Sequence, residues 1–255
     1  MIIMDATNGR QLPELDRLHV EYEFEGRNAE GRGFGIYADA DKWRVWTKEE
    51  AYFALSPAGN APIMLDEESK VMSRIWGGGA TGSELEKRRD HIVALLEVAK
   101  RAMPNNIFTS FAHGQPMYAW GKPEWAINVH REQAEKDAWM QGYGRNAEGR
   151  FEHRGIMDCL NAVTAVLYIK PAGNDFELWK RYADANVKFV RRWQRDVYGA
   201  LHPDSQSLDM WKRQLDYSLA MCDRTIIWHW GKYGPPNSAH QMPDEYRDAV
   251  MERVN

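Results

Sequence analysis

The stretch Pro62-Ile63-Met64-Leu65-Asp66-Glu67-Glu68 decides how the chain is interpreted, because it joins a short apolar run directly to three acidic residues. A strand of a parallel sheet is buried on both faces, so it appears in a sequence as a continuous apolar run. The abrupt change at Asp66 is typical of the point where such a strand emerges at its carboxyl end. We therefore predict a buried parallel strand over residues 62–65.

Strands and helices are predicted to alternate on both sides of this stretch. The other strand candidates are 1–4, 18–24, 34–37, 107–112, 162–168, 196–201 and 224–230. The helix candidates are 48–55, 81–103, 125–140, a helix capped by Asn174 and running from Phe176 to Val190, one carrying Leu208 to Leu219, and one beginning near Pro243. The helix at 81–103 is the best marked, since it opens on the capping-box spacing Thr81-Gly82-Ser83-Glu84.

This alternation predicts an α/β fold with a parallel sheet and helical crossovers. About eight strand candidates in a chain of 255 residues match a (β/α)8 TIM barrel in number and length. A doubly wound sheet is the alternative, but the glycine fingerprint expected after its first strand is missing. We expect one barrel domain over residues 1–255.

Composition excludes several classes of protein. Charged residues make up 27% and hydrophobic residues 44% of the chain, which is ordinary for a globular protein and excludes intrinsic disorder. The net charge is −4 and the Lys and Arg residues form no basic block, so we expect no nucleic-acid partner. No apolar run is long enough to span a membrane. The two cysteines, Cys159 and Cys222, have no metal or redox spacing, and we expect two buried thiols.

Polar and aromatic residues follow the predicted strands at their carboxyl ends, where a (β/α)8 barrel carries its chemistry. These residues are Glu21 and Glu23, then Asp66, Glu67 and Glu68, then His113, Tyr168, Lys170 and His202, and finally Trp228, His229 and Trp230. We therefore expect acids, histidines and aromatic rings to converge on one face.

Asp66 and Glu68 are the sharpest candidates for catalysis. Residues i and i+2 of a strand share a face and lie about 6.5–7 Å apart along the chain. Two carboxyl groups at that spacing repel each other when both are ionised, which raises one pKa and makes a proton donor available near neutrality. Glycoside cleavage needs such a pair, one acid to protonate the leaving oxygen and one anion to stabilise the sugar cation. The same acidic run also fits the solvated start of a loop.

The segment 62–69 resembles the strand-end D-x-E motif of barrel glycoside hydrolases such as hyaluronidases and, more distantly, chitinases. The likeness continues through the long helix, the Pro104-Asn105 turn, the strand 107–112 and Gln115-Pro116-Met117-Tyr118. It also includes the strand ending at Tyr168, and the helix and strand that lead to Trp228. As an order of elements, it covers roughly residues 60–232. The longer chitinase signature is absent, since its earlier positions hold Pro62 and Met64.

The resemblance implies a role for several residues. Glu68 would be the general acid, and Asp66 would orient a substrate acetamido group or act as the stabilising anion. Tyr168 would bind near that group, and Trp228 would form the floor of the sugar site. The residues expected to contact a polysaccharide substrate are Glu21, Glu23, His113, Tyr118, Tyr168, Trp228 and Trp230.

Two other functions stay open. One is a catalytically inactive barrel that binds glycans or serves a structural role, for example on a virus particle, because a fold does not fix a function. The other is a divalent-metal hydrolase built from Glu21, Glu23, Asp66 and histidines. The histidines show no HxH or HExxH spacing, so the glycosidase hypothesis takes no metal and no other cofactor.

The location of the protein is a separate expectation. Residues 1–5 lack the basic region and the apolar length of a signal peptide. Without a signal peptide, we expect a cytoplasmic chain. Because a polysaccharide lies outside cells, the chain could instead be released by lysis, carried on a virus particle or freed of its leader.

Overall fold

The computed structural model describes residues 2–6, 12, 14–21, 45–66, 82–111, 143–145, 151–153, 155–168, 172–191, 195–203, 206–228 and 242–254. Over these residues the chain has a mixed α/β fold with parallel sheets, as predicted. It divides into two compact units. The first comprises Met1–Leu18, Met117–Asn128 and Thr164–Asn255, and the second comprises His19–Pro116 and Val129–Val163.

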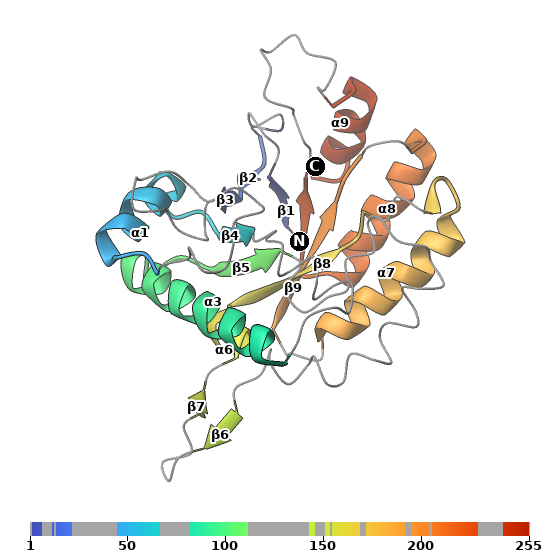
Figure 1. The fold of residues 1–255 in the computed structure, drawn as a ribbon. Helices are drawn as coiled ribbons and strands as arrows, with labels where there is room; N and C mark the ends of the chain where they lie inside the picture. The colour runs from blue at the N-terminus through green and yellow to red at the C-terminus, as the bar shows by residue number, and fades with distance from the viewer. Residues whose placement is uncertain are drawn as a thin grey trace. The chain divides into compact units, whose positions relative to one another are not determined.

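The first unit is built on a five-stranded sheet with the order β2-β1-β10-β9-β8. The strands of this sheet are β1 (Ile2–Asp5), β2 (Asp16–Arg17), β8 (Ala162–Val166), β9 (Asp196–Leu201) and β10 (Arg224–Ile227), and β8 belongs to the first unit from Thr164 onward. β1 pairs in parallel with both β2 and β10, and β10 pairs in parallel with β9. The first strand of the chain therefore lies next to the last one (Figure 1).

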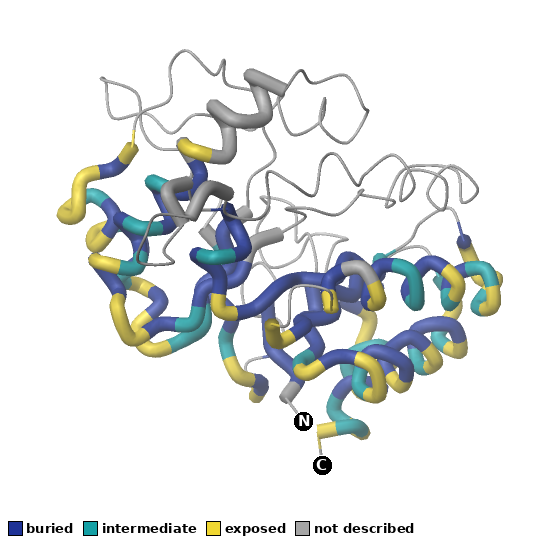
Figure 2. The backbone as a smooth tube through the Cα atoms, turned by 90° about the horizontal axis from the view of Figure 1, so that it is seen from below, coloured by how far each residue is buried: buried dark blue, intermediate teal, exposed yellow. Residues whose placement is uncertain are grey.

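Among the described residues, this unit contains the helices α7 (Phe176–Arg191), α8 (Leu208–Met221) and α9 (Asp244–Met251). α7 packs on β9, α8 packs on β9 and β10, and α9 packs on α8 (Figure 1). Trp179 and Trp211 are fully buried on the inner sides of α7 and α8. In Figure 2 the two helices alternate between buried and exposed stretches, as amphipathic helices on a sheet do.

A hydrogen bond identifies which face of the sheet the helices cover. Thr225 of β10 lies 2.8 Å from Ser218 of α8, hydroxyl to hydroxyl. Gly199, its register partner on β9, also faces α8, since a Cβ atom there would meet Ser218 Oγ at 2.5 Å. Because side chains alternate along a strand, Tyr198 and Ala200 face the other way. Both are fully buried, so the two faces of the sheet are covered alike.

The second unit contains the parallel sheet β3-β4-β5. Its strands are β3 (His19–Glu21), β4 (Ile63–Asp66) and β5 (Phe108–Phe111), and its other elements are α1 (Lys48–Leu55), the short 3-10 helix Ser56–Ala58, α3 (Gly82–Ala102), α6 (Ile156–Cys159) and the antiparallel pair β6 (Tyr143–Arg145) and β7 (Phe151–His153). α3 packs on α1 and on α6. The Asn106 amide ties the turn before β5 to the turn before β4 by donating to the carbonyls of Gly59 and Ala61, both at 2.8 Å.

Most predicted elements within the described residues are confirmed. Helix α1 has the predicted bounds, and the strand predicted at 62–65 is β4, which is shifted by one residue to Ile63–Asp66. The strand predicted at 34–37 and the helix predicted at 125–140 lie outside the described residues. The described strands form parallel sheets of five and three strands, and they do not by themselves show a complete (β/α)8 barrel.

The predicted cap of α7 is wrong by one residue. Asp175 caps the helix, since its Oδ1 accepts from the backbone N–H of Leu178 at 3.0 Å. The side chain of Asn174 instead accepts from the backbone N–H of Ser207 at 2.6 Å, which ties the segment before α7 to the N-cap of α8. The pair β6–β7 was not predicted at all.

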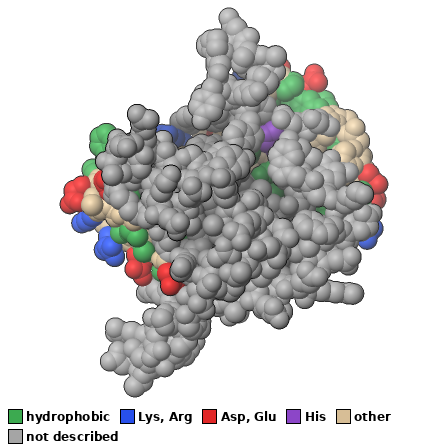
Figure 3. Space-filling view, viewed as in Figure 1, with side chains coloured by type: hydrophobic (Ala, Val, Ile, Leu, Met, Phe, Trp, Pro, Cys, Tyr) green, Lys and Arg blue, Asp and Glu red, His purple; other side chains and the backbone are tan. Residues whose placement is uncertain are grey.

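Acidic and basic side chains of the described residues lie close to one another on the face drawn in Figure 3. No helix among the described residues has the length and apolar character needed to cross a lipid bilayer.

Replacing Gly199 by alanine tests the close packing of α8 on β9. The added Cβ would lie within 3.0 Å of Ser218, Cys222 and Leu167, and overpacking of this kind lowers the free energy of unfolding by about 1–3 kcal/mol. Urea unfolding of Gly199→Ala should show this loss, and the double variant Gly199→Ala/Cys222→Ala should recover part of it. A Gly199→Ala variant as stable as the parent would contradict the packing described here.

Candidate functional site

Three ring-bearing residues follow neighbouring strands of the first unit at the carboxyl edge of its sheet. His202 comes directly after β9, Trp228 directly after β10, and Tyr168 two residues after β8. The strands keep their backbone pairing beyond their ends, because Trp228 N–H donates to Leu201 O and Leu167 N–H donates to Ala200 O, both at 2.8 Å. Tyr168, His202 and Trp228, called the edge cluster here, therefore lie on three adjacent strands.

The edge cluster lies on the face of the sheet opposite the helices. Gly199 and Thr225 face α8, so alternation directs His202 and Trp228 to the other face. Leu167 packs toward Gly199 on the helix side, which gives Tyr168 the same direction as His202. The rings of Tyr168 and His202 meet with their centroids 5.8 Å apart and their planes tilted by 53°.

Exposure differs within the edge cluster. Trp228 is 2% exposed and His202 is 4% exposed, whereas Tyr168 is half-buried. Tyr168 is therefore the member of the edge cluster that a ligand can reach most directly. An aromatic ring with one accessible face and a polar tip suits contact with a sugar, which has apolar and hydroxylated sides.

Asp66 and Glu21 occupy the carboxyl edge of the second unit's sheet. Asp66 is the last residue of β4 and pairs in register with Phe111 of β5. Glu21 is the last residue of β3 and pairs with Leu65, one position before Asp66. The structure thus places the backbones of these two predicted site residues on neighbouring strands. Five other predicted site residues lie outside the described residues, namely Glu23, Glu68, His113, Tyr118 and Trp230.

Asp5 is a buried carboxylate that the sequence analysis did not single out. It is the last residue of β1 and is 1% exposed, and its Oδ2 accepts from Leu12 N–H at 3.4 Å. Its register partner Ile227 shares the helix-facing side of the sheet, so Asp5 is directed away from the edge cluster. The signal for Asp5 was present, because its apolar run Ile2-Ile3-Met4 ends in an acid just as the run before Asp66 does.

The described residues contain no group of side chains that could bind a metal ion as the divalent-metal hypothesis requires. Among the side chains that the structure describes, no three His, Cys, Asp or Glu residues come close enough together to hold an ion. Glu23, His113 and His229, which that hypothesis also uses, lie outside the described residues.

Both cysteines are free and buried, as predicted. Burial raises the pKa of the Cys222 thiol to about 12, and the neighbouring Ser218 and Arg191 offset only part of this effect. Because the thiolate is the reactive form of cysteine, Cys222 is unsuited to act as a nucleophile at neutral pH.

The sequence matches no protein-family model, and a search of curated proteins finds no match either.

The burial of Cys222 predicts a slow thiol reaction. In a Cys159→Ser variant, which isolates Cys222, a disulfide reagent such as DTNB at pH 8 should leave the native thiol unmodified, since pH 8 lies far below a pKa of about 12. The same thiol should react fully in guanidinium chloride. Rapid labelling of the native variant would show that Cys222 is accessible and would contradict the structure.

Proposed function

We propose that this chain is a (β/α)8-barrel glycoside hydrolase that cleaves a polysaccharide with Asp66 and Glu68 as its acid pair. The observation that carries the proposal is the position of Asp66. It is the last residue of a strand with parallel partners on both sides, and the acidic run 66–68 begins there. In barrel enzymes, catalytic residues come from this end of the strands.

Strand order supports the barrel part of the proposal. A barrel pairs each strand with its neighbour in the chain and the first strand with the last. β1 pairs with β10, β9 lies between β10 and β8, and β4 lies between β3 and β5. β2 and β3 are separated only by Leu18, whose N–H donates to Asp5 O. Burial on both faces of β8, β9 and β10 is also expected of barrel strands.

The reaction needs a proton donor at the leaving oxygen and an anion that stabilises the positive charge at the anomeric carbon. We assign the donor role to Glu68, which would protonate the leaving oxygen, and the anion role to Asp66. In a substrate with an N-acetyl group, Asp66 would instead orient the acetamido oxygen for attack on the anomeric carbon. The i, i+2 spacing supports either arrangement, because it keeps the two carboxyl groups on one face of an extended segment.

In this proposal the edge cluster binds sugar at the carboxyl edge of the first unit's sheet. Tyr168 is its most accessible member and would contact the sugar, with the ring of His202 against its own. Sugars are commonly bound by an aromatic face together with a few polar groups that fix their orientation. Glu21 and the other predicted contact residues would provide those polar groups.

Reducing-end release from hyaluronan, chitin and bacterial polysaccharides tests the proposal. The parent should release reducing ends from at least one of them. Glu68→Gln should lower that rate by about 100-fold or more, because loss of a general acid costs about 10²–10⁴-fold. Asp66→Asn should lower it comparably.

Glu67→Gln is the matched control, because it removes one negative charge from the same acidic run on the opposite side of the alternation. It should keep nearly the parent rate. A parent that releases nothing but still binds a glycan would favour the inactive binding barrel, and activity abolished by a chelator would favour the metal hydrolase. Equal losses in Glu67→Gln and Glu68→Gln would contradict the assigned roles.

A further inference from the structure

The last helix of the chain is connected to His202 by two hydrogen bonds. The hydroxyl of Tyr246, in α9, donates to the backbone carbonyl of Gln206, in the segment between β9 and α8. The side-chain amide of Gln206 in turn donates to the carbonyl of His202 at 2.7 Å. A residue near the C-terminus thereby reaches the backbone of the edge cluster.

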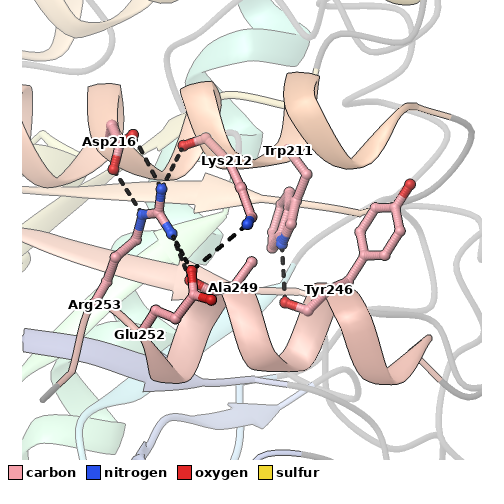
Figure 4. A network of polar contacts seen from close by, with 7 residues as sticks. All are labelled: Trp211, Lys212, Asp216, Tyr246, Ala249, Glu252 and Arg253. Atoms are coloured by element: carbon pink, nitrogen blue, oxygen red, sulfur yellow. Dashed lines mark hydrogen bonds and ion pairs between the residues drawn. The ribbon is translucent and has the colours of Figure 1, made fainter.

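Tyr246 is itself held firmly. The indole N–H of Trp211 donates to the Tyr246 carbonyl at 3.1 Å, and the two rings lie 6.3 Å apart between centroids (Figure 4). Burial, and then the nearby Glu245 carboxylate, raise the pKa of Tyr246. Its hydroxyl therefore stays protonated at neutral pH and serves as the donor to Gln206.

The other end of α9 is attached independently. Arg253 forms a bidentate ion pair with Asp216 of α8, in which Nε lies 2.6 Å from Oδ1 and Nη2 lies 3.0 Å from Oδ2. It also donates to the Ala249 carbonyl at 2.7 Å (Figure 4). Arg253 does not touch Gln206 or His202 in any of these contacts, so it fixes the helix without reaching the edge cluster.

We propose that Gln206 and Tyr246 are positioning residues for His202, so that the Tyr246 end of helix α9 sets the orientation of His202 within the edge cluster. This inference rests on the proposed sugar site and adds to it a role for the C-terminal helix. The peptide groups on both sides of His202 are fixed, since Leu201 O accepts from Trp228 and His202 O accepts from Gln206. With both carbonyls held, the direction of the His202 Cα–Cβ bond is fixed, and the ring meets that of Tyr168.

A second contact extends this arrangement to the neighbouring strand. Asn174, between β8 and α7, accepts from the backbone N–H of Ser207, the residue next to Gln206. The segments after β8 and β9 are therefore bonded to each other as well as to α9. Tyr168 and His202 precede these two segments, and the pairing of Leu167 with Ala200 sets them side by side.

The test is the NMR signal of the His202 ring in the full-length protein labelled at histidine. His202→Gln identifies the signal by its disappearance. Tyr246→Phe removes only the hydroxyl donor, and Gln206→Met removes only the amide donor at similar length. Both variants should shift or split the His202 signal and leave the signals of the other histidines in place. Arg253→Met, the matched control, should lower thermal stability and leave the His202 signal unchanged.

An unchanged His202 signal in Tyr246→Phe and Gln206→Met would overturn the inference, as would an equal shift in Arg253→Met. Activity on the polysaccharide that the parent cleaves provides the second readout. Loss of one positioning hydrogen bond should lower kcat/KM by about 2- to 10-fold in both positioning variants. The two failures are distinguishable, because the ring signal reports positioning even if the parent cleaves no polysaccharide.

Discussion

The parallel pairing of β1 with β10 is the constraint on which the first unit depends. It runs from Ile2 opposite Arg224 to Asp5 opposite Ile227, and it joins β1 to β10 across the sequence. Backbone hydrogen bonds of a sheet fix register, and a shift by one residue would turn every side chain to the opposite face. In this register Thr225 meets Ser218 of α8, and alternation along β10 directs Trp228 away from that helix.

A parallel sheet brings the carboxyl ends of its strands to one edge, and chemistry collects there. In the first unit this edge carries Tyr168, His202 and Trp228, and in the second unit the corresponding edge carries Glu21 and Asp66. Contacts from a helix then support the residues at the strand ends. α9 reaches the backbone of His202 through Tyr246 and Gln206, so the helix that closes the chain also supports the edge.

Apolar periodicity, capping residues and helix-ending residues predicted the elements well, because burial and capping leave local signals in the sequence. The bounds of α1, the end of α3 before Pro104 and the strand before the acidic run are examples. Contacts between segments leave no such signal. Asn174 resembles a cap but bonds to Ser207, and nothing local shows that the rings of Tyr168 and His202 meet. Asp5 was missed although its apolar run has the same form as the one before Asp66.

Chemical-shift mapping of the labelled protein with a chitin trisaccharide and a hyaluronan tetrasaccharide tests most directly whether the strand ends form a sugar site. The account predicts shifts at Tyr168, at His202 and at the residues following β4, and smaller ones at the amino ends of the same strands. Such shifts would appear whether or not the sugar is cleaved. Shifts confined to the amino ends of the strands, or to the exposed face of α1, would contradict a carbohydrate site at the carboxyl edge.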